Sequence, residues 1–192
     1  MRLRKACGIA VTLLLLNGCA APLILGGAAA TGIAVAKDRR TAGTMLDDER
    51  IELNVLNEVA REEELSRGSH LNVTSYNGIV LLSGEVETEA MGRRIAELAG
   101  KVAKVREVKN ALRIGPPSSA GERSRDTVIT TRVKSRLVSD KAVDGTSIKV
   151  ISEHGTVYLM GLVSRDEAAS AVEVTRNTNG VQRIVKVFEY TP

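Results

Sequence analysis

A repeated stretch constrains the fold of this chain more than any other feature. Segment 71–86, LNVTSYNGIVLLSGEV, returns later in the chain as segment 148–163, IKVISEHGTVYLMGLV. The identical positions include Val73 and Val150, Gly78 and Gly155, Val80 and Val157, Leu82 and Leu159, Gly84 and Gly161, and Val86 and Val163. Such spaced identities in a chain of 192 residues indicate an internal duplication. We therefore expect two small domains of the same fold.

Each copy has the pattern of a β-hairpin. Apolar and polar residues alternate up to a turn at Asn77-Gly78 or His154-Gly155, and a second apolar run follows. Asn-Gly is a strong hairpin signal because both residues tolerate positive φ. We expect four glycines to serve backbone geometry rather than phosphate binding, because neither copy has a strand, glycine loop and helix with lysine. These structural glycines are Gly78, Gly84, Gly155 and Gly161.

The alternation also assigns side chains to the two faces of each hairpin. The first hairpin places Val80 and Leu82 on one face and Ile79 and Leu81 on the other, and the second places Val157 and Leu159 toward the core. Tyr158 and Met160 then point outward. They either pack against the first domain or are partly exposed, and partial exposure is the simpler interpretation.

Helices and a third strand are predicted around each hairpin. Ile51, Val55 and Val59, with Leu56 beside them, form the apolar face of a helix that begins near Leu46. The remaining expected elements are a helix over about 89–100, a strand over 105–112, a helix containing Ile129, Val133 and Leu137, a helix over about 165–177 after a capping box at Ser164 and Glu167, and a strand over 182–190. Each domain therefore has the order helix, strand, strand, helix, strand. The expected domains are 46–114 and 122–192, joined by a Gly- and Pro-rich linker at 115–121.

The N-terminus has the pattern of an export signal. Basic residues at Arg2, Arg4 and Lys5 precede an apolar run, and Leu16-Asn17-Gly18-Cys19 resembles the lipobox of bacterial lipoproteins. That resemblance implies a signal peptide over 1–18, lipidation of Cys19 and a tether over 19–45. Ala20 favours sorting to the outer membrane. The alternatives are an uncleaved membrane anchor, because apolar residues continue through 22–36, and a tether whose segment 23–36 lies in the membrane interface.

Composition argues against several classes of function. Without the three basic residues of the signal the balance is 24 basic and 23 acidic residues, and the chain has no Trp and one Phe, which argues against nucleic-acid binding. Cys7 leaves with the signal and Cys19 carries lipid, so none remains for a disulfide or a metal. His70 and His154 have no ligands at metal-site spacing, and no nucleophile motif is present. We therefore expect neither an enzyme nor a cofactor.

The doubled glycine pattern, with its following G-x-V and closing strand, resembles BON domains. Two such domains behind a lipobox resemble dual BON-domain outer-membrane lipoproteins over nearly the whole chain. The resemblance implies an α+β fold with a three-stranded mixed sheet and two helices on one face, in each domain. It also implies a lipid-anchored protein on the periplasmic face of the outer membrane. Such a protein binds anionic phospholipid and supports envelope integrity, with a place at division sites and near the outer-membrane β-barrel assembly machinery.

The two first helices differ in charge. Residues 47–65 carry two basic and eight acidic side chains, a net −6, whereas residues 123–139 carry five basic and one acidic, a net +4. Because each Lys or Arg near an anionic surface contributes ~1 kcal/mol, we expect the second helix to dock on anionic lipid. The predicted phospholipid-binding residues are Arg125, Val128, Arg132 and Arg136.

Alternatives to this surface remain open at this point. One alternative is that the basic face of this helix is exposed to solvent and binds nothing. In addition, members of the BON-domain family can carry a bulky aromatic residue where this chain has Val128. A valine buries less area, so we expect shallower insertion and greater sensitivity to salt. A different class of function is an adaptor that binds protein partners through its acidic first helix or its outward sheet face.

Overall fold

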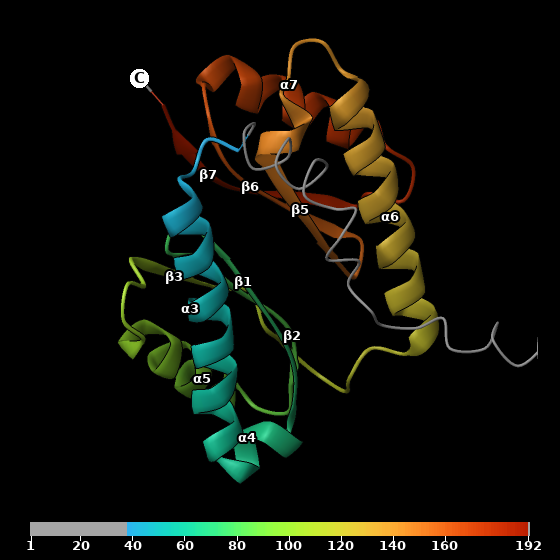
Figure 1. Ribbon diagram of the computed structural model, residues 1–192. Coiled ribbons are helices and arrows are strands. Elements are labelled where there is room, and N and C mark those ends of the chain that lie inside the picture. Colours follow the sequence, from blue (N-terminus) through green and yellow to red (C-terminus); the bar gives the residue numbers. More distant parts are fainter. Residues whose placement is uncertain (1–37, 192) are drawn as a thin grey trace, which may run out of the picture. The chain divides into compact units, whose positions relative to one another are not determined.

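The computed structural model describes residues 38–191 (Figure 1). The predicted signal peptide, the lipidation site at Cys19 and the segment 23–36 lie outside the described residues. All three apolar clusters of the structure belong to one compact unit, Ala36–Pro192. We expect this unit to fold by itself, because the three clusters are built from residues within it.

The first domain has the predicted order of elements, with two additions. Its elements are α3 (Ala42–Arg61), α4 (Glu63–Arg67), β1 (Ser69–Tyr76), β2 (Ile79–Val86), α5 (Glu89–Lys101), β3 (Glu107–Asn110) and β4 (Arg113–Ile114). The short α4 follows α3, and the third strand is in two pieces because the Asn110 side chain accepts from the Leu112 amide and interrupts the ladder. Strand β2 is central, antiparallel to β1 and parallel to β3 and β4.

The second domain repeats this topology. Its elements are α6 (Ala120–Ser139), the 3-10 turn η2 (Gly145–Ser147), β5 (Ile148–Glu153), β6 (Thr156–Val163), α7 (Arg165–Arg176) and β7 (Arg183–Tyr190). Strand β6 is central, antiparallel to β5 and parallel to β7. The duplicated sequence therefore forms two mixed sheets with the same connections, and the predicted α+β fold is confirmed.

Both first helices begin earlier than the sequence pattern placed them. Helix α3 starts at Ala42, before the expected domain start at Leu46, because the Thr41 hydroxyl accepts from the Thr44 amide at 3.1 Å. Helix α6 starts at Ala120, inside the expected linker, because Ser119 and Glu122 form a capping box. Hydrophobic periodicity does not reach the first turn of either helix, so the caps decide where each helix starts.

The glycines occupy the two places where each hairpin demands them. Gly78 and Gly155 have φ of 76° and 70° in the turns, where a side chain would be strained. In the following strands the chains approach closely. A Cβ on Gly84 would overlap the His70 carbonyl, and a Cβ on Gly161 would lie 2.9 Å from the Ser147 oxygen.

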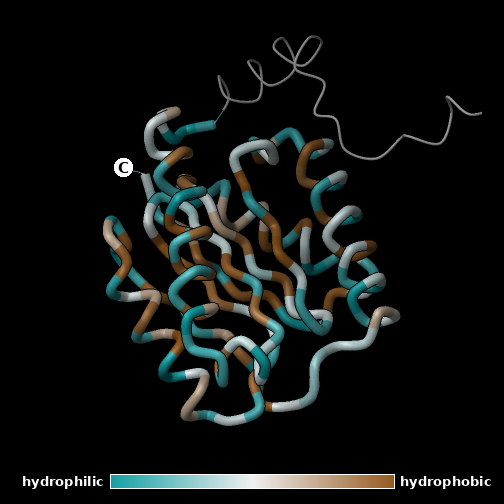
Figure 2. The backbone as a smooth tube through the Cα atoms, turned by 60° about the horizontal axis from the view of Figure 1, so that its bottom comes forward, coloured by the Kyte–Doolittle hydropathy of each residue, from teal (hydrophilic) through white to brown (hydrophobic). Residues whose placement is uncertain are grey.

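Each sheet is covered on one face by its own two helices. In the first domain α3 contributes Ile51, Val55 and Val59, and these pack with Val80 and Leu82 of β2 and with α5. In the second domain the α6 residues Ile129, Val133 and Leu137 pack with Val157 and Leu159 of β6 and with α7. Figure 2 shows hydrophobic residues along the strands that these helices cover. Leu56, which was expected beside the apolar face, is instead 40% exposed.

The other faces of the two sheets pack against each other. Ile79 and Leu81 of β2 meet Tyr158 and Met160 of β6, with Tyr76 and Val187 in the same cluster. The expectation that Tyr158 and Met160 are partly exposed is therefore wrong, since they are 8% and 0% exposed. The alternative interpretation, packing against the first domain, is confirmed. The elements form four layers: helices, sheet, sheet, helices.

Polar contacts border this sheet-to-sheet cluster. Lys149 and Glu52 form an ion pair at 2.9 Å, and Arg106 and Glu189 form another at 2.8 Å. The two domains are thus joined by charge pairs around an apolar centre.

The last residues of the expected tether also contact the domains. Arg39 pairs with Glu167 at 2.5 Å and lowers the pKa of that carboxyl to about 2. Arg40 pairs with the buried Asp48 at 2.8 Å and lies over the Tyr76 ring at 4.0 Å. Residues 39 and 40, which were expected in the tether, therefore belong to the folded unit.

Candidate functional site

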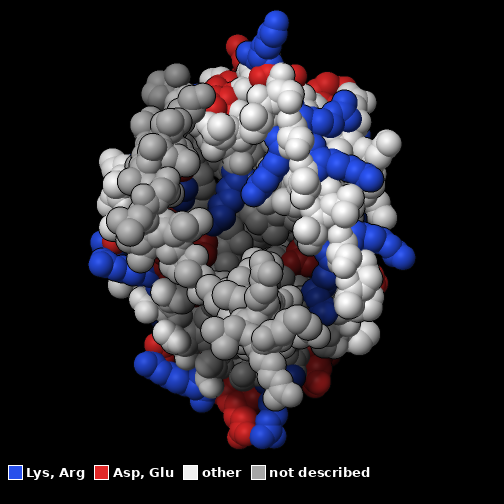
Figure 3. Space-filling model, turned by 45° about the vertical axis from the view of Figure 1, so that its right-hand side comes forward, with Lys and Arg blue, Asp and Glu red and all other residues white. Residues whose placement is uncertain are grey.

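Helix α6 presents the predicted lipid-binding residues on its outer side. Its core residues recur every four positions and are buried in the second domain. The residues Arg125, Val128, Arg132 and Arg136 lie on the exposed part of the same helix, and Val128 is 45% exposed. Figure 3 shows Lys and Arg side chains projecting on the side of the molecule where Figure 1 places α6. The structure therefore brings these four residues to one accessible helix surface.

Three of the four arginines of α6 are positioned by neutral groups. Arg132 donates to the Asn179 carbonyl at 3.4 Å, and Arg136 donates to the Asn177 carbonyl in the same loop after α7. Arg123 donates to the Ser118 carbonyl. A carbonyl oxygen orients a guanidinium without cancelling its charge, so each arginine remains a full positive charge at the surface.

The α6 cations differ in this respect from most exposed cations elsewhere. Within residues 38–191 no ion pair involves Arg123, Arg125, Arg132, Lys134 or Arg136. By contrast, Arg61 pairs with Glu58 on α3, and Arg93 pairs with Glu89 on α5, both at 2.6 Å. Of the ten Lys and Arg side chains without an ion pair within residues 38–191, five therefore lie on α6.

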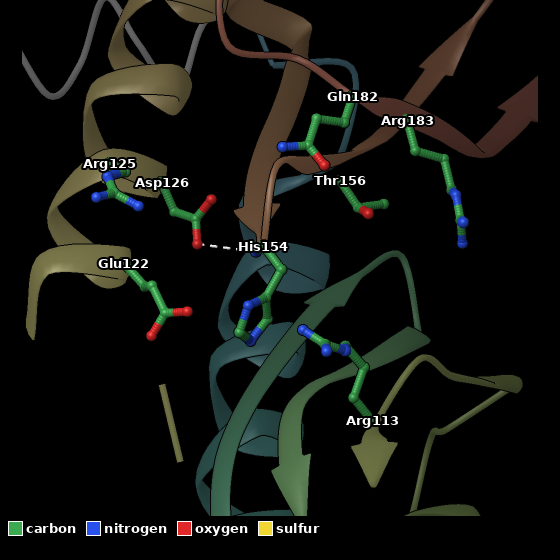
Figure 4. Close-up of a pocket in the computed structure, with 8 residues that line it drawn as sticks. All are labelled: Arg113, Glu122, Arg125, Asp126, His154, Thr156, Gln182 and Arg183. Atoms are coloured by element: carbon green, nitrogen blue, oxygen red, sulfur yellow. Dashed lines mark hydrogen bonds between the residues drawn. The ribbon is translucent and has the colours of Figure 1, made fainter. Parts of the chain in front are cut away.

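A hollow of about 620 Å³ adjoins the N-terminal half of α6 (Figure 4). Three arginines from different elements line it: Arg125 of α6, Arg113 of β4 and Arg183 of β7. The sequence pattern identified only Arg125. Arg113 and Arg183 are distant in the chain and reach this place because both domains contribute to its wall, which no spacing rule reveals.

The two carboxyl groups in this hollow already have partners. Asp126 is buried and accepts from the His154 and Gly155 amides at 2.8 and 2.9 Å, which fixes the hairpin turn (Figure 4). Glu122 belongs to the capping box of α6. Their negative charges balance part of the local positive charge, so the outer face of α6 is more cationic than the hollow.

Both histidines of the chain bond to one buried carboxyl group. Glu85 is 2% exposed and accepts from His70 at 3.0 Å, from the Ser118 amide at 3.2 Å and from His154. Burial alone would raise the pKa of Glu85, but these hydrogen bonds outweigh burial and hold its pKa below the usual value. His154 lies in the turn as expected, but the shared bond was missed because its members are far apart in sequence.

The prominent feature of the described residues at this site is their charge. Within 38–191 no group of three or more His, Cys, Asp or Glu side chains is arranged to hold a metal ion. Over the same residues, none of the helices combines the length and the apolar character needed to cross a bilayer. The arrangement on α6 can attract and orient an anion-bearing surface.

Comparison with known proteins agrees with this architecture. The BON domain profile matches residues 47–116 and 125–192. The outer membrane lipoprotein DolP of Haemophilus influenzae is 40% identical over 175 residues, covering 91% of this chain and 90% of that protein. The 21 kDa hemolysin of Actinobacillus pleuropneumoniae is 39% identical, covering 80% of this chain and 79% of its own length.

A more distant relative also matches most of the chain. The osmotically-inducible protein Y of Escherichia coli K12 is 25% identical over 145 residues, covering 74% of this chain and 72% of that protein. Two matched domains, and high identity over nearly the whole length, show the family. The chain belongs to the BON-domain family and, within it, to the DolP group of outer-membrane lipoproteins.

Proposed function

We propose that this lipoprotein binds anionic phospholipid through the exposed face of α6 and thereby supports the integrity of the outer membrane. The observation that carries the proposal is the set of α6 cations without ion pairs among the described residues. Cations that are already paired within the protein have little charge left to offer a surface. Each unpaired Lys or Arg near anionic lipid contributes ~1 kcal/mol, so several together give useful affinity.

Val128 sets how the helix meets the bilayer. Its side chain is 45% exposed and lies among the arginines, so it supplies a small apolar contact. Burying about half of a valine contributes roughly 1 kcal/mol, which is less than the charges contribute together. Binding is therefore mainly electrostatic, and salt should weaken it strongly, since the Debye length falls to about 3 Å at 1 M salt.

The lipid anchor at Cys19 and the surface of α6 act together in this proposal. An acyl anchor keeps the domains close to the membrane, and the tether then raises the effective concentration of α6 at the lipid surface. Weak electrostatic docking is sufficient in that setting. A role at division sites, and contact with the assembly machinery for outer-membrane β-barrels, belong to the same proposal and rest on the family resemblance.

Vesicle sedimentation of the unit 36–192, which lacks the anchor, tests the surface. The double variant Arg132→Gln/Arg136→Gln removes two charges but keeps hydrogen-bond donors for the loop after α7. We expect about 30-fold weaker binding to vesicles that contain phosphatidylglycerol, from ~2 kcal/mol. Arg93→Gln/Lys101→Gln on α5 is the matched control and should bind like wild type.

A second variant separates charge from loop structure. Arg125 has no hydrogen bond or ion pair among the described residues, so Arg125→Glu changes charge without removing a contact. It should also weaken binding. Equal binding of the wild type, both α6 variants and the α5 control would eliminate the proposal.

A further inference from the structure

Helix α3 of the first domain exposes a stripe of leucines. Leu46, Leu53 and Leu56 are 55%, 61% and 40% exposed. Successive helical residues turn by about 100°, so these three fall in a sector about 80° wide. The buried residues Ile51, Val55 and Val59 lie on a different face. In Figure 1 no described helix or strand lies in front of α3.

The spacing of this stripe is that of a coiled-coil seam. Ala42, Leu46, Glu49, Leu53, Leu56 and Ala60 alternate in steps of four and three residues, which is the a/d pattern of heptads. We call these six positions the α3 seam. It covers nearly the whole helix, a length of about 27 Å at 1.5 Å per residue. A surface with this period fits a helix better than a strand.

The duplication shows that the fold does not need these leucines. Counted from the matching Asp48 and Asp126, the positions of Leu46, Leu53 and Leu56 correspond to Ser124, Thr131 and Lys134 of α6. All three α6 residues are exposed, and α6 packs on its sheet in the same way. Leucines at solvent-facing positions whose counterparts are polar call for an explanation other than stability.

Charge identifies the kind of partner. Of the eight acidic side chains between Ala42 and Arg67, only Glu49 and Glu64 have no ion pair within residues 38–191, whereas all three basic side chains of this segment are paired. Within residues 38–191, Glu49 has no hydrogen bond or ion pair and sits in the seam between Leu46 and Leu53. An anionic membrane would be repelled by this helix. In a second copy of α3, Glu49 would face Leu53 or another Glu49, both unfavourable.

We infer that the α3 seam binds a basic amphipathic helix of a protein partner. The leucines of the seam pack against apolar side chains of that helix, and Glu49 pairs with a Lys or Arg among them. The inference is independent of lipid binding, because α3 and α6 belong to different domains.

A synthetic peptide tests the inference directly. The probe is an 18-residue helix with leucines at its core positions, one lysine placed opposite Glu49, and further lysines outside. Fluorescence anisotropy with the unit 36–192 measures binding, and a peptide of the same composition in scrambled order is the control. Leu46→Ser/Leu53→Thr gives α3 the residues of α6, and it should bind at least tenfold more weakly. Val138→Thr, which removes an exposed apolar residue of α6, should bind like wild type.

A charge reversal at Glu49 provides a second test in case the variant Leu46→Ser/Leu53→Thr is unstable. Glu49→Lys should weaken binding of the lysine peptide and restore binding of a peptide with glutamate at that position. Unchanged binding in both sets of variants, or equal binding of the scrambled peptide, would overturn the inference. Two other results would also overturn it. If the wild type is a dimer and the leucine variant is a monomer, the seam binds a second copy of this chain. If the leucine variant loses binding to vesicles, the seam binds a membrane.

Discussion

Helices α3 and α6 are two copies of one element with the same interior and opposite exteriors. Inside, Asp48 and Asp126 hold the hairpin turns, and the apolar residues match along both helices. Outside, Asp47, Asn54 and Glu58 of α3 correspond to Arg125, Arg132 and Arg136 of α6. The comparison teaches that packing fixes only the inner face of each helix. The outer faces were free to acquire different binding properties.

Substitution of the two aspartates that bind the hairpin turns should give the largest loss of stability. Asp48 accepts from the Asn77 and Gly78 amides, from Ser75 and from Arg40, whereas Asp126 accepts from two amides. Asp48→Ala should cost about 3–5 kcal/mol, because it leaves the turn amides without an acceptor and removes one of the two carboxylates, Asp38 and Asp48, that pair with the part-buried Arg40.

The second aspartate serves as its control. Asp126→Ala should cost about 1–3 kcal/mol, the penalty for buried donors without acceptors. Urea unfolding of both variants measures the difference. Equal losses would mean that Arg40 adds nothing to the first turn.

The sheet-to-sheet cluster tests whether the two copies unfold independently. Met160 is fully buried there, so Met160→Ala should cost about 2–5 kcal/mol. Because its neighbours Ile79 and Leu81 belong to the first domain, amide exchange should accelerate in both domains. Acceleration confined to the second domain would show that the cluster does not couple them. Val138→Ala on the surface of α6 is the control and should change neither.

Acid stability should distinguish the two copies at the position of Glu85, which corresponds to Leu162 in the second domain. Hydrogen bonds hold the pKa of Glu85 below its usual value despite burial. A carboxyl group with a lowered folded-state pKa stabilises the fold above the unfolded pKa of about 4.3 and loses that contribution as pH falls further.

A substitution of Glu85 tests whether its ionised form stabilises the fold. In Glu85→Gln the decline of unfolding free energy between pH 5 and 3 should be shallower than in wild type, measured by urea unfolding at each pH. An identical slope would show that Glu85 titrates alike in both states. Glu107→Gln, on an exposed glutamate of β3, is the control.

The smallest expected effect concerns the leucines of the α3 seam. Leu53→Thr, which copies the α6 residue Thr131, should change the free energy of unfolding by less than about 0.5 kcal/mol. Val55→Thr, two positions away but fully buried, should cost about 1–3 kcal/mol because it buries a hydroxyl. Thermal melting compares the two. A large loss in Leu53→Thr would mean that the seam is structural.

Most of the fold followed from local patterns. The order of elements, the hairpins with their Asn77-Gly78 and His154-Gly155 turns, and the core faces of α3 and α6 were predicted, because periodicity and turn chemistry act over few residues. The starts of both helices were missed at Thr41 and Ser119, where a cap rather than hydrophobic periodicity determines the boundary.

The candidate site was only partly predictable. The four α6 residues share one exposed helix surface because helical spacing is regular. Whether an arginine has a carboxylate partner depends on side chains from distant elements. Arg113 and Arg183 likewise reach Arg125 only because distant elements come together in the fold. The hydrogen bonds of His70 and His154 to Glu85 could not be predicted for the same reason, since they join three segments that are separate in the sequence.

The sequence by itself determined the duplication, the order of elements in each half and the opposite charges of the two first helices. These properties are local or repeat along the chain. The tertiary structure alone decided that Tyr158 and Met160 are buried between the sheets, that the α6 cations have no ion pairs within residues 38–191, and that the α3 leucines are exposed. Such properties depend on which surfaces meet, and apolar periodicity looks the same whether a face lies against a sheet, a second domain or water.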